Sequence, residues 1–191
     1  MAIEPEHFRI TYNEVHNIIK HSAKDIAEFN PDIMIAIANI LEATQHAQKC
    51  AHLCNGLSLY EEVPGLAAEA IGSQVIRTQW LPEAGEILLR KRVLIVDEVD
   101  DSRKTLQYAV SELRKDVEKA IQLLPEHERD DAKSQFAVFV VHNKLKTKLG
   151  SIPSDIPYYA GEDVEDIWLD YPWEARDIEE HDRLALAQKK V

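Results

Sequence analysis

An abrupt change from apolar to acidic residues near the middle of the chain constrains its fold more than any other feature. Residues 93–96 are four apolar β-formers, and four acids follow within residues 97–101. Hydroxyl and basic side chains occupy residues 102–105, and a helical pattern begins at Leu106. This order is typical of a buried strand, a loop and a helix start. Ligands of open α/β sheets bind beyond the carboxyl ends of the strands, so we expect a site in which carboxylates hold hydroxyls or Mg²⁺ and helix-start amides hold phosphate.

Buried strands alternate with helical patterns along the rest of the chain. Thr11 is a candidate N-cap, with Glu14 three residues later as in a capping box. The patterns predict helices over 10–29, 39–53, 106–124 and 177–190, strands over 33–37, 57–60, 75–80, 93–96 and 136–141, a loop at 61–69 and a turn at 82–85. This alternation indicates an α/β fold with a mainly parallel sheet flanked by helices. We expect one domain over 1–191, with a small hood formed mainly by about 142–176, where Pro, Tyr and Trp are frequent.

Charge and hydropathy argue against several classes of protein. The chain has 22 basic and 34 acidic residues, a net charge of −12, whereas nucleic-acid binding favours a basic face. No apolar run approaches the ~18–20 residues needed to cross a bilayer. The first six residues carry acids where a secretory signal carries bases. We therefore expect a cytoplasmic protein that contacts neither membrane nor nucleic acid.

Three segments resemble one family of enzymes. Residues 93–105 resemble the motif that binds phosphoribosyl pyrophosphate (PRPP) in the type I phosphoribosyltransferases. Residues 57–61 (Leu-Ser-Leu-Tyr-Glu) and 168–174 (Trp-Leu-Asp-Tyr-Pro-Trp-Glu) resemble the fungal and bacterial purine phosphoribosyltransferases that take hypoxanthine, guanine or xanthine. The resemblance covers roughly 8–37 and 57–185. It implies the type I phosphoribosyltransferase fold.

The resemblance also implies a reaction of purine nucleotide salvage. Such an enzyme transfers the phosphoribosyl group of PRPP to a 6-oxopurine and releases the nucleoside 5′-monophosphate and pyrophosphate. Mg²⁺ is the implied cofactor, PRPP and a purine base are the implied partners, and a homodimer is the implied assembly. The sequence leaves open which of the three bases is preferred.

At the PRPP end of the site, the resemblance gives roles to the acidic pair and to the turn after it. Asp97 and Glu98 would bind the ribose 2′- and 3′-hydroxyls, directly or through Mg²⁺, because carboxylates accept hydroxyl protons. The residues that match the turn around the 5′-phosphate are Ser102, Arg103, Lys104 and Thr105. Many relatives have glycine in place of Arg103, although fungal purine enzymes resemble this chain in having a base there. The residues that match the start of the flexible loop closing over PRPP are Ser58 and Tyr60.

Asp101 matches the catalytic acid or base of the family. It would face N7 of the purine and remove or share its proton while the glycosidic bond forms at N9. We expect the neighbouring acids Asp97, Glu98 and Asp100 to raise its pKa. The alternative is that Asp101 caps the following helix.

At the purine end, the resemblance places an aromatic platform and a lysine. Trp168 would stack on the base, and the backbone of Leu169 would read its pyrimidine edge. Lys144 would donate to the 6-oxo group and so select oxopurines over adenine. The rivals of Lys144 for this role are Lys146 and Lys148. The implied metal ligands are Asp97, Glu98 and Glu174, the last for a second Mg²⁺; the alternative for Trp168 is a core tryptophan.

Residues 38–56 depart from the family. In relatives the first strand runs into a glycine-rich loop that binds pyrophosphate and then into Pro-Ala-Arg. Here no glycine occurs between Ile37 and Gly56, and no arginine occurs between Ile37 and Arg77. Three explanations stay open: a mis-joined exon, a divergent loop in a working enzyme, or a PRPP-binding regulatory protein that has lost catalysis.

Overall fold

The structure is a computed structural model that describes residues 7–37, 54–55, 57–58, 76–77 and 84–189. Side chains are described for 7–37 and 84–189. The elements in chain order are β1 His7–Arg9, α1 Tyr12–Phe29, β2 Ile33–Ile37, β3 Cys54–Asn55, β4 Leu57–Ser58, β5 Ile76–Arg77, α2 Ala84–Leu88, β6 Arg92–Asp100, α3 Lys104–Leu123, α4 Glu126–Arg129, the 3₁₀ turn Asp130–Ala132, β7 Gln135–Lys144, β8 Tyr158–Val164, β9 Trp168–Asp170 and α5 Ile178–Gln188. None of the helices in these ranges is long and apolar enough to cross a membrane.

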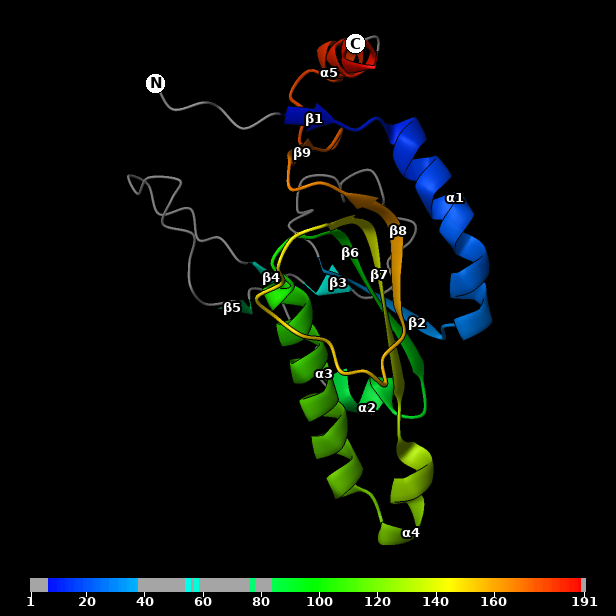
Figure 1. Ribbon diagram of the computed structural model, residues 1–191. Coiled ribbons are helices and arrows are strands. Elements are labelled where there is room, and N and C mark those ends of the chain that lie inside the picture. Colours follow the sequence, from blue (N-terminus) through cyan, green and yellow to red (C-terminus); the bar gives the residue numbers. More distant parts are fainter. Residues whose placement is uncertain (1–6, 38–53, 56, 59–75, 78–83, 190–191) are drawn as a thin grey trace.

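The main sheet has five parallel strands in the order β3-β2-β6-β7-β8. Helix α1 packs against β7 and β8 on one face, and α3 covers the other face together with α2 (Figure 1). A sheet covered on both faces needs strands that are apolar on both faces. This explains the continuous apolar runs of β6 and β7, and it confirms the expected α/β architecture.

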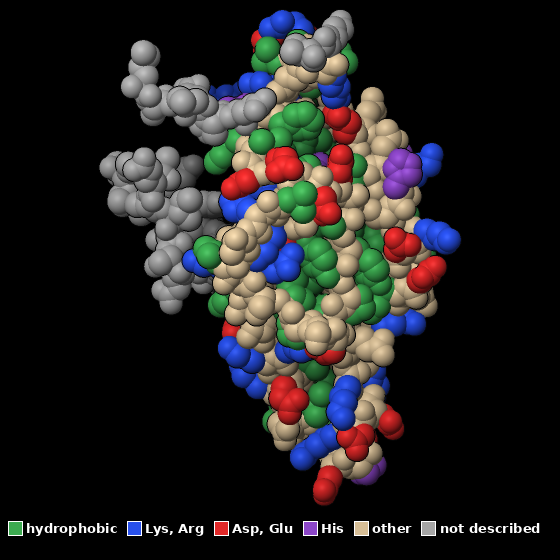
Figure 2. Space-filling model, in the orientation of Figure 1, with side chains coloured by type: hydrophobic (Ala, Val, Ile, Leu, Met, Phe, Trp, Pro, Cys, Tyr) green, Lys and Arg blue, Asp and Glu red, His purple; other side chains and the backbone are tan. Residues whose placement is uncertain are grey.

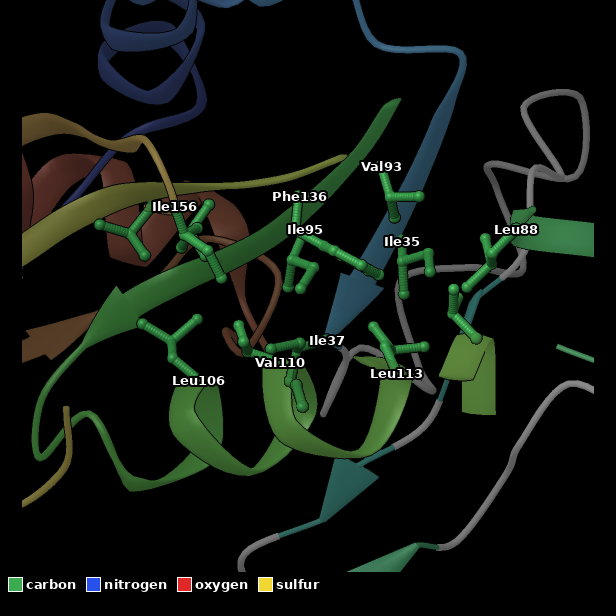
Figure 3. Close-up of a cluster of buried hydrophobic side chains, with 14 of the residues drawn as sticks. Ile35, Ile37, Leu88, Val93, Ile95, Leu106, Val110, Leu113, Phe136 and Ile156 are labelled. Carbon is green, nitrogen blue, oxygen red and sulfur yellow. The ribbon is translucent and has the colours of Figure 1, made fainter. Parts of the chain in front are cut away.

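Alternate residues of the central strand enter two separate cores. Val93 and Ile95 point toward α3 and pack with Val110 and Leu113 (Figure 3). Leu94 faces the opposite way and packs in the cluster under α1. This period of two follows from the pleat of a β-strand, and burial of one such side chain contributes about 1.5–3 kcal/mol.

Helix α1 begins and ends as the sequence predicts. The Thr11 hydroxyl accepts from the backbone N–H of Glu14, and the Glu14 carboxylate accepts from the backbone N–H of Thr11 at 2.8 Å, which confirms the capping box. The helix ends at Asn30, which adopts a left-handed conformation (φ 53°) before Pro31. Asparagine tolerates this conformation better than most residues, and proline cannot continue the helical hydrogen bonds.

The two ends of the chain meet in a second, small layer. Strand β1 pairs in parallel with β9, and α5 packs against β1 (Figure 1). The ring of His181 in α5 hydrogen-bonds the carbonyl of Ile10 at 2.9 Å. Strand β1 was not predicted from the sequence, because three residues carry too little periodicity to be recognised.

Several boundaries differ from the sequence predictions. Of the expected hood over about 142–176, residues up to Lys144 end β7 and Tyr158–Val164 form a strand of the main sheet, whereas Trp168–Asp170 belong to the small layer. Ala84 and Gly85, expected in a turn, begin helix α2. The helix expected over 39–53 and the loop expected at 61–69 lie outside the described residues.

Candidate functional site

The central strand is longer than the sequence predicts and carries the acids with it. Residues 97–100, expected in a loop, continue β6 to Asp100. Their backbone pairs with β7, where Val99 lies opposite His142 and Asp100 lies opposite Asn143. An extended backbone turns successive side chains to opposite faces, so neighbouring acids meet different surroundings.

A pocket of about 210 Å³ lies where β6 and β7 approach the small layer. Its lining comes from strands β6, β7 and β9, from the turn after β6 and from the residues that follow β9. The residues that line it are Glu98, Val99, Asp101, Lys144, Trp168, Leu169, Tyr171 and Glu174. Six of these eight were predicted site residues, so the tertiary structure brings together side chains that are up to 76 positions apart.

Asp97 and the pocket residue Glu98 lack a cation among the described residues. Burial raises the pKa of Asp97 well above its usual range, and the charges of Glu98 and Asp100 add to the shift. Burial raises the pKa of Glu98 to about 7, and the charge of Glu174 adds to it. One carboxylate oxygen of Glu98 is buried without a hydrogen-bond partner. A buried acceptor of this kind is costly unless a proton or a cation reaches it.

Asp101 has the opposite surroundings. Burial alone would raise its pKa, but the ammonium groups of Lys146 and Lys144 outweigh burial and lower it. The Nζ atoms of Lys146 and Lys144 lie 2.7 and 3.6 Å from Oδ1 of Asp101. The expectation that neighbouring acids raise this pKa was wrong, because lysines from the end of β7 lie closer to the carboxylate. Acidic and basic side chains lie next to one another in the upper half of the face shown in Figure 2.

The turn between β6 and α3 is formed by Asp101, Ser102 and Arg103. Helix α3 begins at Lys104, and Arg103 occupies the N-cap position without a side-chain cap. Asp101 therefore does not cap the helix, which removes the alternative raised by the sequence. The Ser102 hydroxyl accepts from the backbone N–H of Lys104 at 3.4 Å, and Thr105 lies in the first turn. The first amides of a helix have no partner within it and can bind an anion.

At the far side of the pocket, Trp168 is open to solvent. Trp168 is 55% exposed, so it is not a core tryptophan. The neighbouring Leu169 side chain is buried in the core under α1. The Glu174 carboxylate accepts from the backbone N–H of Tyr171 at 3.3 Å, and burial raises the pKa of Glu174. The backbone of Ser58 lies in β4, whereas its side chain and the whole of Tyr60 lie outside the described part of the chain.

Known proteins with similar sequences cover nearly the whole chain. Xanthine phosphoribosyltransferase 1 of Saccharomyces cerevisiae is 42% identical over 97% of this chain and 98% of its own length. The hypoxanthine-guanine phosphoribosyltransferase of Schizosaccharomyces pombe is 40% identical over 94% of this chain and 95% of its own. The chain is a purine phosphoribosyltransferase. No model in a scan of protein families matches it.

Solved structures support the fold of this phosphoribosyltransferase. A hypothetical protein from Neisseria gonorrhoeae with bound ppGpp is 33% identical, with a TM-score of 0.73 over 97% of this chain and 99% of that one. A purine phosphoribosyltransferase from Pyrococcus horikoshii is 22% identical, with a TM-score of 0.56 over 90% and 96%. The type I phosphoribosyltransferase fold expected from the sequence is confirmed. The catalytically impaired alternative is not favoured, because the curated relatives are named as enzymes.

The departure at residues 38–56 lies almost entirely outside the described part of the phosphoribosyltransferase. The alignment with the Saccharomyces cerevisiae xanthine enzyme spans 208 residues, more than the 191 of this chain, so that relative has residues without a counterpart here.

Tyr171 joins the small layer to the main sheet and was not predicted as a site residue from the sequence. Its hydroxyl donates to the carbonyl of Glu98 at 3.0 Å and lies 2.8 Å from Nδ1 of His142. Burial lowers the pKa of His142 to about 4, so the imidazole is neutral and its Nδ1–H can donate to the hydroxyl. The Tyr171 ring stacks on Trp173 with centroids 4.6 Å apart. A tyrosine beside the Trp168 motif was the available signal, but its partners are 29 and 73 positions away.

The acids of the pocket fit Mg²⁺ in chemistry and number. Among the described residues, no group of three or more His, Cys, Asp or Glu side chains forms a ready cage. Mg²⁺ is commonly held by one or two carboxylates together with water and substrate phosphates. Glu98 and Glu174 line one pocket, the charge of Glu174 adds to the raised pKa of Glu98, and one buried oxygen of Glu98 has no hydrogen-bond partner.

Proposed function

We propose that this enzyme transfers the 5-phosphoribosyl group of PRPP to N9 of hypoxanthine, guanine or xanthine. The side-by-side placement of Asp101 and Lys144 in the pocket carries the proposal. Their charged atoms lie 3.6 Å apart. A 6-oxopurine presents N7 and O6 on one edge, so a carboxylate for the N7 proton beside an ammonium for O6 matches that edge. Adenine has an amino donor at this position, so it would offer the buried ammonium no acceptor.

Lys144 suits the 6-oxo group better than its two rivals. It lines the pocket, whereas Lys146 and Lys148 do not. Lys146 is held between Asp101 and Asp166, with N–O distances of 2.7 and 2.8 Å. Lys148 donates to three backbone carbonyls. Their donors are therefore committed to protein atoms more closely than those of Lys144, whose Nζ lies 3.6 and 3.9 Å from Asp101 and Asp166.

Asp101 serves as the general base in this proposal. Because nearby lysines lower its pKa, it is a carboxylate at neutral pH and can accept the N7 proton as the glycosidic bond forms at N9. Trp168 offers an exposed indole face for stacking, and the backbone of Leu169 reads the pyrimidine edge. The guanine base of ppGpp in the Neisseria gonorrhoeae relative is itself a 6-oxopurine.

At the other end, the turn of Ser102, Arg103, Lys104 and Thr105 binds the 5′-phosphate of PRPP. Asp97 and Glu98 bind the ribose hydroxyls, directly or through Mg²⁺, and Glu174 adds a ligand near the pyrophosphate. Mg²⁺ supplies positive charge that offsets the charge of the departing pyrophosphate. Ser58 and Tyr60 belong to the loop that closes over PRPP. We place this reaction in the cytoplasm. We also propose that the enzyme is a homodimer, which sedimentation analysis would test.

Two measurements on the purified protein test the proposal together. Calorimetry with Mg²⁺-PRPP reports binding, and transfer from PRPP to radiolabelled hypoxanthine, guanine, xanthine or adenine reports turnover. We expect binding and turnover with at least one oxopurine and little with adenine. PRPP binding without turnover would instead favour a regulatory protein, and adenine as the best base would refute the role of Lys144.

A further inference from the structure

Asp100 is a buried carboxylate that the proposed chemistry does not use. Its side chain is 0% exposed, and it lies at the last position of β6, directly before the phosphate-binding turn. Its Oδ2 atom accepts from Nε and Nη2 of Arg103 at 2.8 and 2.7 Å and from the Tyr158 hydroxyl at 2.7 Å. Three donors on one oxygen indicate a built ion pair rather than a chance contact, because a buried charge is tolerated only when it is paired.

Arg103 contributes to this pair from an unusual backbone position. Its φ is 67°, in the left-handed region that disfavours residues with a Cβ. The side chain folds back from the turn onto Asp100, and its guanidinium lies over the Tyr158 ring, 4.7 Å from the centroid. The ion pair and the cation–π contact therefore offset the free-energy cost of the left-handed backbone conformation. Two donors of this guanidinium, Nε and Nη2, are therefore committed to Asp100.

The connection between β7 and β8 closes around the same turn. Nζ of Lys148 donates to the carbonyls of Asp100, Asp101 and Lys144 at 2.5, 3.1 and 2.8 Å. The Ser102 carbonyl accepts from the N–H groups of Leu149 and Gly150 at 3.0 and 3.1 Å. A Cβ on Gly150 would lie 2.6 Å from the Arg103 carbonyl, so this approach requires glycine. The turn is thus fixed both by the side-chain contacts of Asp100 and Arg103 and by hydrogen bonds to its backbone carbonyls.

We propose that Asp100 and Arg103 are positioning residues for PRPP. Their buried ion pair, completed by Tyr158 and Lys148, fixes the backbone of residues 101–105 in the conformation that presents amides to the 5′-phosphate. Arg103 acts on the phosphate through this backbone and not through its guanidinium. The inference rests on the proposed function, since the phosphate is that of PRPP.

Breaking and then rebalancing the ion pair tests the inference. Arg103→Gly permits the left-handed backbone but leaves Asp100 buried without its main partner. We expect the Kd and KM for PRPP to rise about tenfold, the loss typical for a residue that orients a ligand-binding group. The double variant Asp100→Asn with Arg103→Gly removes both charges and should recover about threefold of that loss. The KM for the purine should stay within about twofold, because the base end of the pocket is untouched.

An exposed Arg–Asp pair is the control. Arg114 in α3 pairs with Asp155 in the β7–β8 connection, but Asp155 is 68% exposed. Arg114→Gln with Asp155→Asn should change neither KM, because exposed pairs contribute little. A loss of folded protein would lower kcat without changing KM for PRPP, so the rise in KM separates positioning from general destabilisation.

The outcomes separate this inference from the proposed function. Wild-type affinity for PRPP in Arg103→Gly would overturn the inference. If Arg103→Gly does not fold, Tyr158→Phe decides, since it removes one donor to Asp100 and keeps the ring under Arg103; an unchanged KM for PRPP would then overturn the inference. A third outcome is that the wild-type protein binds ribose 5-phosphate and Arg103→Gly weakens that binding, while neither protein transfers the phosphoribosyl group from PRPP. In that case the proposed function fails and the positioning role stands.

Discussion

Four acids of one strand end meet two opposite electrostatic environments. Asp97 and Glu98 are buried among acids, and their pKa values rise. Asp101, three residues beyond Glu98, lies between lysines that lower its pKa, and Asp100 is paired with Arg103. Glu98 and Asp101 lie only three residues apart, so the difference between them comes from the distant residues Glu174, Lys144 and Lys146 and not from the local sequence.

The comparison separates two tasks within one motif. Acids that have no cation beside them in the described part of the chain can receive one from outside, which suits the Mg²⁺-bound ribose end of PRPP. An acid already flanked by lysines stays ionised and can accept a proton from the base.

Removal of the Asp101 charge tests whether the carboxylate beside the lysines accepts the proton of the base. Asp101→Asn keeps the shape of the side chain but cannot accept a proton, so kcat should fall by roughly 10²-fold or more, the usual contribution of general acid–base catalysis. The Kd for PRPP should change little. Steady-state kinetics with the oxopurine that the wild type uses best measures the effect, and Asp155→Asn, exposed on the β7–β8 connection, is the control. Full turnover in Asp101→Asn would remove the catalytic role.

The pH dependence of stability tests the burial of Glu98 among acids. The pKa of Glu98 rises from 4.5 to about 7 on folding, so between these values the folded protein holds more protons than the unfolded chain. The free energy of unfolding should therefore fall as pH rises from 5 to 8, by about 3 kcal/mol at most. Urea unfolding without Mg²⁺ measures this loss, which Glu98→Gln should reduce. A profile of the wild type that is flat over this range would contradict the assigned burial of Glu98.

Two lysines beside Asp101 sharpen the contrast further. Lys144→Gln should lower kcat/KM for oxopurines by about 30-fold, because a weaker donor faces the 6-oxo group, with a smaller change for adenine. Lys146→Gln should instead shift the acid limb of the kcat profile upward in pH, because it removes the nearest cation from Asp101. Kinetics with hypoxanthine and adenine across pH compares the two variants. A larger loss of oxopurine selectivity in Lys146→Gln would reverse the assignment.

The smallest effect concerns the aromatic platform. Trp168→Ala should raise the KM for the purine about tenfold through lost stacking and contact area, and Trp168→Phe should recover part of it. The Kd for PRPP should not change in either variant. Equal purine KM values in wild type and Trp168→Ala would show that the base lies elsewhere.

Much of the fold was predictable because its signals are local. The capping box of Thr11 and Glu14, the apolar period of α3 and the buried runs of β2, β6 and β7 each depend on residues that are close in sequence. The PRPP motif could also be read directly from residues 93–105. The three-residue strands β1 and β9 carry no such signal, and they exist because the chain ends pair with each other.

The sequence alone determined which chemical groups are available and where one strand delivers its acids, since both depend on residue type and short-range pattern. The tertiary structure decided how those acids behave. It placed Lys144 and Lys146 beside Asp101, brought the Tyr158 hydroxyl to Asp100, and left Glu98 near Glu174. The physical reason is that electrostatic interactions and burial depend on distance in space, and partners more than 40 positions apart along the chain become neighbours only when the sheet is assembled.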